Sequence, residues 1–245
     1  MSPIEIAFVV LAAGFASVVK SMLGSGYPMI LIPAIALFAT VETAATIVAP
    51  ANVAINALLA VELWNRRTET IFLGRFVVAS VVGAAIGALI LPIAPDRALR
   101  LVLVGVIVSF IVNRRGQLSR SLSREAAARY GPVVGGVAGV FQGATGVSGP
   151  IVMPWHLSLG LERDAFVLSV SVIYGLSSFA QLAFIAGQGL FDTERLVLGL
   201  VLIPIALALA PIGSRLRRRL ELAVFERLVI ALLIASAVSL AVRSF

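Results

Sequence analysis

The sequence predicts an all-α polytopic membrane protein with two inverted structural repeats, each a broken-helix hairpin plus about three spanning helices. Three observations support this prediction. The chain of 245 residues is 60% hydrophobic and 13% charged, with a mean hydropathy of +1.07, whereas soluble domains are about half apolar and about a quarter charged. Its apolar residues form long runs separated by short basic connections. One glycine-rich segment occurs twice, at matching places in the two halves.

The repeated segment combines an apolar stretch, a glycine-rich break and a proline. A shift of 122 positions lays Gly24 on Gly146 and Pro28 on Pro150. Glycine permits positive φ, and proline disfavours helix in the residue before it. Each copy therefore predicts a helix, a break and a short second helix that begins near the proline. The two copies are GFASVVKSMLGSGYPMILIP at 14–33 and GVAGVFQGATGVSGPIVMP at 136–154.

Segment lengths suggest how each half is built. The first half has apolar segments at roughly 4–22, 28–40, 43–63, 71–93 and 97–113. The second half has them at roughly 131–145, 149–160, 165–187, 195–213 and 224–243. Runs near 20 residues can cross the hydrocarbon, and runs of about 12–15 are too short to cross it upright. We therefore expect a hairpin of broken helices, either spanning or re-entrant, at the start of an N-terminal repeat (1–113) and of a C-terminal repeat (130–245). A basic cytoplasmic linker (114–129) joins the two repeats.

Positive charge decides between two topologies. If each hairpin returns the chain to its starting side, one side carries most of the arginines and both termini lie outside the cytoplasm. A rival model, in which each hairpin counts as one crossing, places the basic run at 215–219 opposite the basic linker, so we prefer the first. On the cytoplasmic side it places Arg66, Arg67, Arg75, Arg114, Arg115, Arg120, Arg124, Arg129, Arg163, Arg215, Arg217, Arg218 and Arg219. Opposite them it places Arg97, Arg100, Arg195 and Arg243.

Small residues at every fourth position predict close helix packing, because lipid offers no hydrophobic drive for helix association. Gly83 and Gly87 form one such pair. Longer stripes are Gly131, Gly135, Gly139 and Gly143 in the second half and Ala13, Ser17 and Ser21 in the first.

The two breaks are the candidate site. Non-helical backbone at membrane depth is tolerated only inside protein or along a wet cavity, and the N-termini of the short helices attract anions. The competing interpretation is a pair of tight turns at the membrane surface. The candidate substrate-binding residues at the breaks are Gly24, Ser25, Gly26, Tyr27, Thr145, Gly146, Val147, Ser148 and Gly149.

Lys20 is the only lysine of the chain and precedes the first break by four residues. A charge within an apolar segment is a functional-site hypothesis by default, so Lys20 is a candidate counter-ion for a bound anion. The alternative is that it snorkels to a membrane surface. Gln142 occupies the matching position in the second half and can donate hydrogen bonds without charge.

Polar side chains at helical spacing follow each break. We expect the two faces to line the site, although hydrogen bonding between helices explains any single residue equally well. These candidates are Asn52 and Asn56 in the first half and Tyr174, Ser178 and Gln181 in the second.

The other polar residues have mainly structural explanations. Glu42 and Asp164 match at the same shift and suit the first turn of a helix, and a role in proton coupling is the less favoured alternative. His156 beside Trp155 suggests a position at the membrane interface. The chain has no cysteine, which excludes disulfides and thiolate metal sites, and we expect no metal and no cofactor. The isoelectric point near 11.2 reflects arginines that set topology, so we expect no nucleic-acid partner.

The two motifs resemble those of the sulfite exporter TauE/SafE family of permeases. Gly24-Ser25-Gly26-Tyr27-Pro28 is similar to the N-terminal signature, although Ser25 interrupts the glycine run. Residues 139–150 resemble the C-terminal signature more closely. The resemblance covers nearly the whole chain and implies a bacterial inner-membrane (plasma-membrane) carrier of sulfite, sulfoacetate or related organosulfur or organic acids.

We therefore expect a secondary transporter, most simply an exporter, that works by alternating access around the two breaks. Walker A is absent from the sequence, so energy would come from a gradient, with H⁺ or Na⁺ as a possible coupling ion. An anion channel on the same architecture is an alternative. A further alternative is an intramembrane serine protease that uses Ser148, but its one candidate base, His156, lies about 12 Å along a helix. We expect no enzymatic activity, and the sequence does not define the oligomeric state.

Overall fold

The computed structural model describes residues 1–70, 73–102 and 123–219, together with the single positions 104, 105, 108, 224, 227 and 231. All regular structure in this part of the chain is helical. Four of its helices, α1, α3, α8 and α9, are long and apolar enough to cross a membrane. The predicted segments 97–113 and 224–243 and the linker up to residue 122 lie largely outside the described residues.

The first half begins with α1 (Pro3–Leu23), which is followed by the short α2 (Tyr27–Ile35). The long helix α3 (Val41–Glu62), a 3₁₀ helix η1 (Trp64–Glu69) and α4 (Leu73–Ile90) complete its described part. Ser2 caps α1 through a reciprocal pair of bonds with Glu5, and Thr40 caps α3. Such side chains satisfy the free amide groups of a helix start.

The second half repeats this order with α6 (Arg124–Thr145), α7 (Gly149–Leu157), α8 (Arg163–Gly187) and α9 (Thr193–Arg217). A shift of 122 places α2 on α7 at both ends and aligns the other three pairs closely. Helix α6 begins seven residues before the predicted apolar segment at 131, because Ser123 caps a polar first turn. The last residues of the predicted linker are therefore helical.

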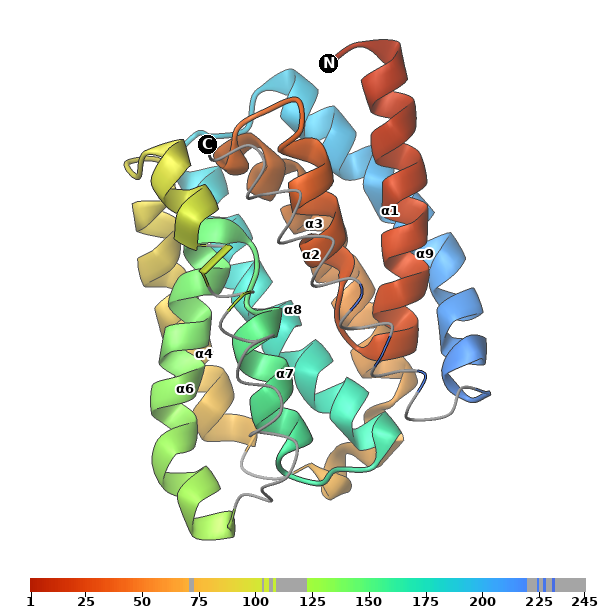
Figure 1. Ribbon diagram of the computed structural model, residues 1–245, viewed down its shortest axis with the longest axis vertical. Coiled ribbons are helices and arrows are strands. Elements are labelled where there is room, and N and C mark those ends of the chain that lie inside the picture. Colours follow the sequence, from red (N-terminus) through yellow and green to blue (C-terminus); the bar gives the residue numbers. More distant parts are fainter. Residues whose placement is uncertain are drawn as a thin grey trace.

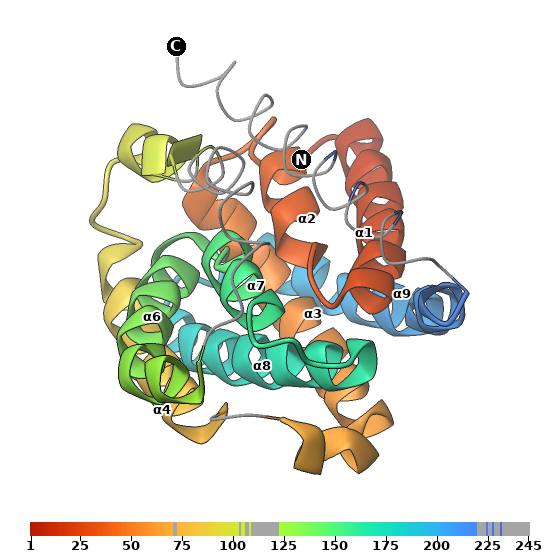
Figure 2. The same ribbon diagram turned by 60° about the horizontal axis from the view of Figure 1, so that its bottom comes forward.

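The two halves pack through equivalent pairs of helices. Helix α1 packs against α9, and α4 packs against α6 (Figure 2). Because α1 corresponds to α6 and α4 to α9, these two contacts are counterparts of each other. Helix α3 packs against its own counterpart α8 near the centre. In Figure 1, α1 runs down from the N-terminus whereas α6 runs up, and α2 and α7 each return toward the end from which their hairpin started.

The contact between α4 and α6 is a backbone contact. A Cβ atom on Gly139 would lie 2.1 Å from the carbonyl oxygen of Ser80, and one on Gly143 would lie 2.1 Å from that of Ala84. Gly83 and Gly87 approach α6 equally closely. The predicted glycine stripe therefore packs as expected at these positions, but Gly131 makes only ordinary van der Waals contact.

Ion pairs hold the two ends of the molecule. At one end Arg217 bonds to Glu62 of α3 and Asp164 of α8, at 3.2 and 3.1 Å, and we call these three residues the Arg217 cluster. At the other end Arg195 pairs with Glu42 and Asp192, at 2.9 and 3.2 Å, and these form the Arg195 cluster. Glu42 and Asp164 start equivalent helices, as predicted, and each also binds an arginine of α9.

Three further arginines can be assigned to these ends from their contacts and their places in the chain. Arg100 bonds to the carbonyls of Ala36 and Ala39, which precede α3, so it lies at the Arg195 end. Arg66 follows α3, and Arg163 bonds to the carbonyl of Arg217, so both lie at the Arg217 end. Each hairpin thus returns the chain to the end from which it came.

The close contact between the backbones of α4 and α6 predicts how one substitution changes stability. We expect Gly139→Ala to force α4 and α6 apart and to lower the free energy of unfolding by about 1–3 kcal/mol, the usual effect of overpacking. Gly136→Ala is the matched control on the same helix, because its Cβ would meet nothing nearer than 3.9 Å. Thermal unfolding of the two variants in detergent measures the difference. Equal melting temperatures would contradict the packing argument.

Candidate functional site

The two breaks have the same local geometry. Helix α1 ends at Gly24, whose φ is 76° and whose N–H donates to the carbonyl of Lys20 at 2.8 Å. Helix α6 ends at Gly146, whose φ is 75° and whose N–H donates to the carbonyl of Gln142 at the same distance. A left-handed residue at this position is a common way to end a helix and favours glycine. The break therefore follows directly from the repeated sequence.

The short helices start directly after the breaks. Gly26, with φ of 124°, precedes α2, and Ser148 precedes α7. Neither residue caps its helix through a side chain. Both starts carry a proline in the first turn, where it suits helical backbone. The two starts therefore present partial positive charge to their surroundings.

The breaks of the two halves meet inside the protein. A Cβ atom on Gly149 would lie 2.4 Å from the sulfur of Met29 and 2.9 Å from the hydroxyl of Ser25, both in the first half. Gly24 in turn packs against Val167 and Val170 of α8. The breaks are therefore not surface turns, which was the competing interpretation of the sequence.

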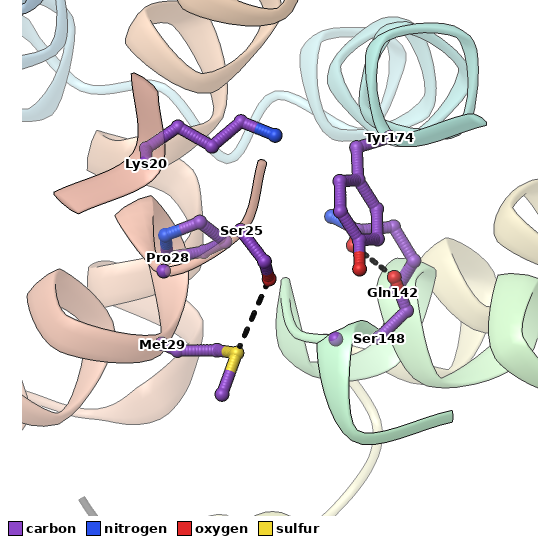
Figure 3. A pocket seen from close by; sticks show the side chains of 9 residues that line it. Lys20, Ser25, Pro28, Met29, Gln142, Ser148 and Tyr174 are labelled. Atoms are coloured by element: carbon purple, nitrogen blue, oxygen red, sulfur yellow. Dashed lines mark hydrogen bonds between the residues drawn. The ribbon is translucent and has the colours of Figure 1, made fainter. Parts of the chain in front are cut away.

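A small cavity lies where the breaks meet (Figure 3). It has a volume of about 10 Å³, which is about the smallest volume that holds one water. Its polar side chains are almost fully buried, with Ser25 and Tyr174 the most exposed of them at 5%, whereas Pro28 is half-buried. The lining residues are Lys20, Ser25, Gly26, Pro28, Met29, Gln142, Ser148, Gly149 and Tyr174.

Lys20 brings the charge of this cavity. Its side chain is 1% exposed, and its Nζ donates to the carbonyl of Gly24 at 2.6 Å. The same nitrogen lies 4.6 Å from the ring centre of Tyr174 in the opposite half, a cation–π distance. Within the described part of the chain, no carboxylate forms an ion pair with Lys20. Because Lys20 is buried inside the protein, its amine does not extend to a membrane surface.

Gln142 is the counterpart of Lys20 in geometry as well as in sequence. Its amide donates to the carbonyl of Gly146 at 3.1 Å, as Lys20 does to Gly24, and its amide oxygen accepts from the hydroxyl of Ser148 at 2.8 Å. The same amide group also contacts Ser178 and Gln181 of α8. One half therefore offers a cation and the other a neutral donor at equivalent places.

The structure brings seven of the sixteen predicted site residues to the cavity wall, as the cavity's lining shows. Of the two polar helix faces, only Tyr174 reaches the cavity, so the expectation that the faces line it as a set is not met here. Asn52 bonds to Ser178 at 2.7 Å, Asn56 to Asn52, and Gln181 to the carbonyl of Gly143. These bonds form a network between helices behind the wall.

The remaining predicted residues shape the breaks from outside the cavity. Thr145 bonds to the carbonyl of Phe141 and to the N–H of Val147, which closes the turn. Tyr27 is buried, and its hydroxyl has no hydrogen-bond partner among the described residues. Sequence reasoning missed Pro28 and Met29 as lining residues, although Pro28 ends the first glycine motif and Met29 follows it directly. Nothing in an apolar side chain such as Met29 marks it as a cavity residue before the fold is known.

His156 is buried inside the protein, and its predicted position at the membrane interface stays a prediction. It is 2% exposed, its Nδ1 lies 3.0 Å from the carbonyl of Val152, and its ring packs edge-on against Phe76 at 5.0 Å. Ser148 donates to Gln142 and not to His156. The Ser148–His156 pair that a serine protease needs is therefore not formed among the described residues. The same residues hold no cluster of His, Asp and Glu suited to a metal ion.

Comparison with known protein families agrees with this arrangement. The family model described as sulfite exporter TauE/SafE matches residues 9–240. The chain belongs to the sulfite exporter TauE/SafE family. It is therefore a membrane transport protein, as its apolar helices indicate. No curated protein and no solved structure matches the chain.

The meeting point of the breaks can be tested by adding one methyl group. We expect Gly149→Ala to press on Met29 and Ser25 and to reduce transport strongly, because the methyl group would occupy space that the first half already fills. Gly187→Ala is the matched control, because a Cβ there meets nothing within 4 Å. Transport rates in vesicles with equal amounts of folded protein give the comparison. Full activity of Gly149→Ala would show that the two breaks are not in contact during transport.

Proposed function

We propose that this protein is a secondary transporter of a small anion such as sulfite, sulfoacetate or a related organosulfur or organic acid. One observation carries the proposal. Lys20 is a buried cation without a carboxylate partner among the described residues, in a cavity where two helix starts meet. An unpaired charge in a low-dielectric interior is costly, and a bound anion would neutralise it. The two helix starts add favourable positive potential.

The two halves are proposed to be inverted repeats. Support comes from the helix bounds that recur at a shift of 122, from the exchanged contacts of α1 with α9 and α4 with α6, and from the opposite directions of α1 and α6 in Figure 1. Inverted repeats with sites at broken helices allow alternating access, in which one half moves against the other around a central site.

The described conformation fits the closed step of such a cycle. The cavity has room for about one water, so an anion of several heavy atoms needs the halves to separate slightly. The Arg217 cluster and the Arg195 cluster each join α9 to a helix start at one end of the molecule. We propose that opening toward one side breaks one cluster and leaves the other intact.

We place the Arg217 end in the cytoplasm, because most of the arginines collect there and cytoplasmic loops favour positive charge. Both chain termini then lie outside the cytoplasm, and the membrane is the bacterial inner membrane. Export is the proposed direction, in keeping with the name of the family. An enzymatic role has no supporting geometry in the described residues.

Transport by purified protein in vesicles tests the proposal. We expect labelled sulfite or sulfoacetate uptake to saturate and to be driven by counterflow, which separates a carrier from a channel. Binding should also raise the melting temperature with dose, because a ligand that binds only the folded state stabilises it. Absence of both responses for sulfite, thiosulfate, sulfoacetate and simple carboxylates would reject a small-anion carrier.

Variants then test the assigned cavity. We expect Lys20→Ala and Ser148→Leu to reduce counterflow to the background of empty vesicles, because the first removes the cation and the second fills the cavity. Arg75→Gln is the matched control, since it removes an exposed cation at the start of α4. Normal anion flux through both cavity variants, with the control unchanged, would show that the anion binds outside this cavity.

A further inference from the structure

We propose that Lys20 carries a proton together with each anion, so that the protein is a proton–anion symporter in which one side chain binds both ions. This inference rests on the proposed function, because it names the coupling ion of the same cavity. A transporter that moves an anion in one net direction must return its empty site across the membrane, and that empty site must be stable.

The empty cavity has nothing to balance a charged Lys20. The Nζ atom has a carbonyl oxygen at 2.6 Å and an aromatic ring at 4.6 Å, and both are neutral. Burial in a low-dielectric interior disfavours the charged form of a group that lacks an opposite charge. A neutral amine avoids this cost and still donates a hydrogen bond to Gly24.

Among the described residues, the groups around Lys20 supply no counter-charge. Helix α2 contributes Pro28 and Met29 to the cavity wall, α8 contributes Tyr174, and the second break contributes uncharged Gln142 and Ser148. Helix α9 contributes Arg217, which donates to the carbonyl of Ser21 beside Lys20.

The charges around Arg217 are already balanced. Its guanidinium pairs with Glu62 of α3 and Asp164 of α8, and Arg163 donates to its carbonyl. Both carboxylates that pair with Arg217 are therefore engaged, and within residues 1–70, 73–102 and 123–219 no carboxylate forms an ion pair with Lys20.

Other proton carriers are poorly placed. Glu62 and Asp164 are about 30% exposed and are paired with Arg217, and Glu42 is 27% exposed and is paired with Arg195. His156 is buried against Phe76 and does not line the cavity. The tyrosine phenols ordinarily titrate near pH 10. In the described part of the chain, Lys20 is the titratable amine that touches the site.

The proposed cycle conserves charge and protons. With an anion bound, Lys20 is an ammonium and neutralises one negative charge. After the anion leaves, the ammonium releases its proton to water on the same side, and the neutral amine returns. It takes up a proton on the opposite side before the next anion binds. One proton therefore crosses with each anion in the same direction. Export by this cycle is driven by the outward gradient of the anion, because the proton that accompanies it leaves against the usual inward proton gradient.

Proton movement by the wild-type protein tests this directly. The probes are thiosulfate and sulfoacetate, whose acid groups are ionised near neutral pH, so a proton that crosses with them is carried by the protein. Vesicles that enclose a pH-sensitive dye should acidify inside during net uptake, with one proton for each labelled anion. Net uptake without acidification would overturn the symport while leaving anion transport intact. No exchange or uptake of either probe would reject the proposed function itself, and this inference with it.

Lys20→Arg separates exchange from net transport. Arginine stays protonated throughout the usable pH range, so the empty site cannot return in neutral form. Anion exchange never passes through an empty site. We therefore expect Lys20→Arg to keep part of the exchange rate, and this rate should not fall as pH rises. Wild-type exchange should weaken as pH rises, because the anion binds the protonated lysine. Net uptake by Lys20→Arg should fall to the vesicle background.

Arg75→Gln is the control variant. It should keep the wild-type dependence of exchange on pH and the wild-type ratio of protons to anions. Proton-coupled net uptake by Lys20→Arg at the wild-type rate would overturn the assignment of the proton to Lys20. If Lys20→Arg fails to fold, the proton count of the wild-type protein still decides whether symport occurs.

Discussion

Two interruptions of helical backbone inside a membrane protein are the constraint on which this structure depends. Backbone groups freed by a break cannot be left facing lipid, because nothing there can bond to them. The protein meets this requirement by burying each break against the other half. Gly149 lies against Met29 and Ser25, and Gly24 lies against α8. The fold and the candidate site thus have the same origin.

Close packing of the outer helices holds the two hairpins together. Close contact between α4 and α6, and between α1 and α9, brings the two hairpins near enough for their tips to meet. Gly213 shows the same device on α9, because a Cβ there would lie 2.2 Å from the carbonyl of Val18. Small residues replace the hydrophobic effect as the means of association in lipid. The site therefore depends on glycines that never touch it.

Symmetry in the backbone coexists with asymmetry in charge. Lys20 and Gln142 occupy equivalent positions and bond to equivalent carbonyls, but only Lys20 can be charged. Tyr174 of the second half then covers Lys20, whereas its counterpart Asn52 bonds to Ser178. A duplicated scaffold thus positions one cation near its centre. Ion pairs at both ends close this scaffold, and both involve α9.

The sequence by itself determined the helical membrane class, the two related halves, the breaks and most helix bounds, because glycine, proline and apolar runs act locally. It also indicated Lys20, Ser148 and Tyr174. Only the tertiary structure decided that Asn52 bonds to Asn56 and Ser178 and that Gln181 bonds to the carbonyl of Gly143 behind the cavity wall. It also decided that His156 is buried and that Met29 lines the site. Hydrogen-bond partners and burial depend on which helix faces meet. That choice is made by contacts between residues of different helices, and no local pattern records it.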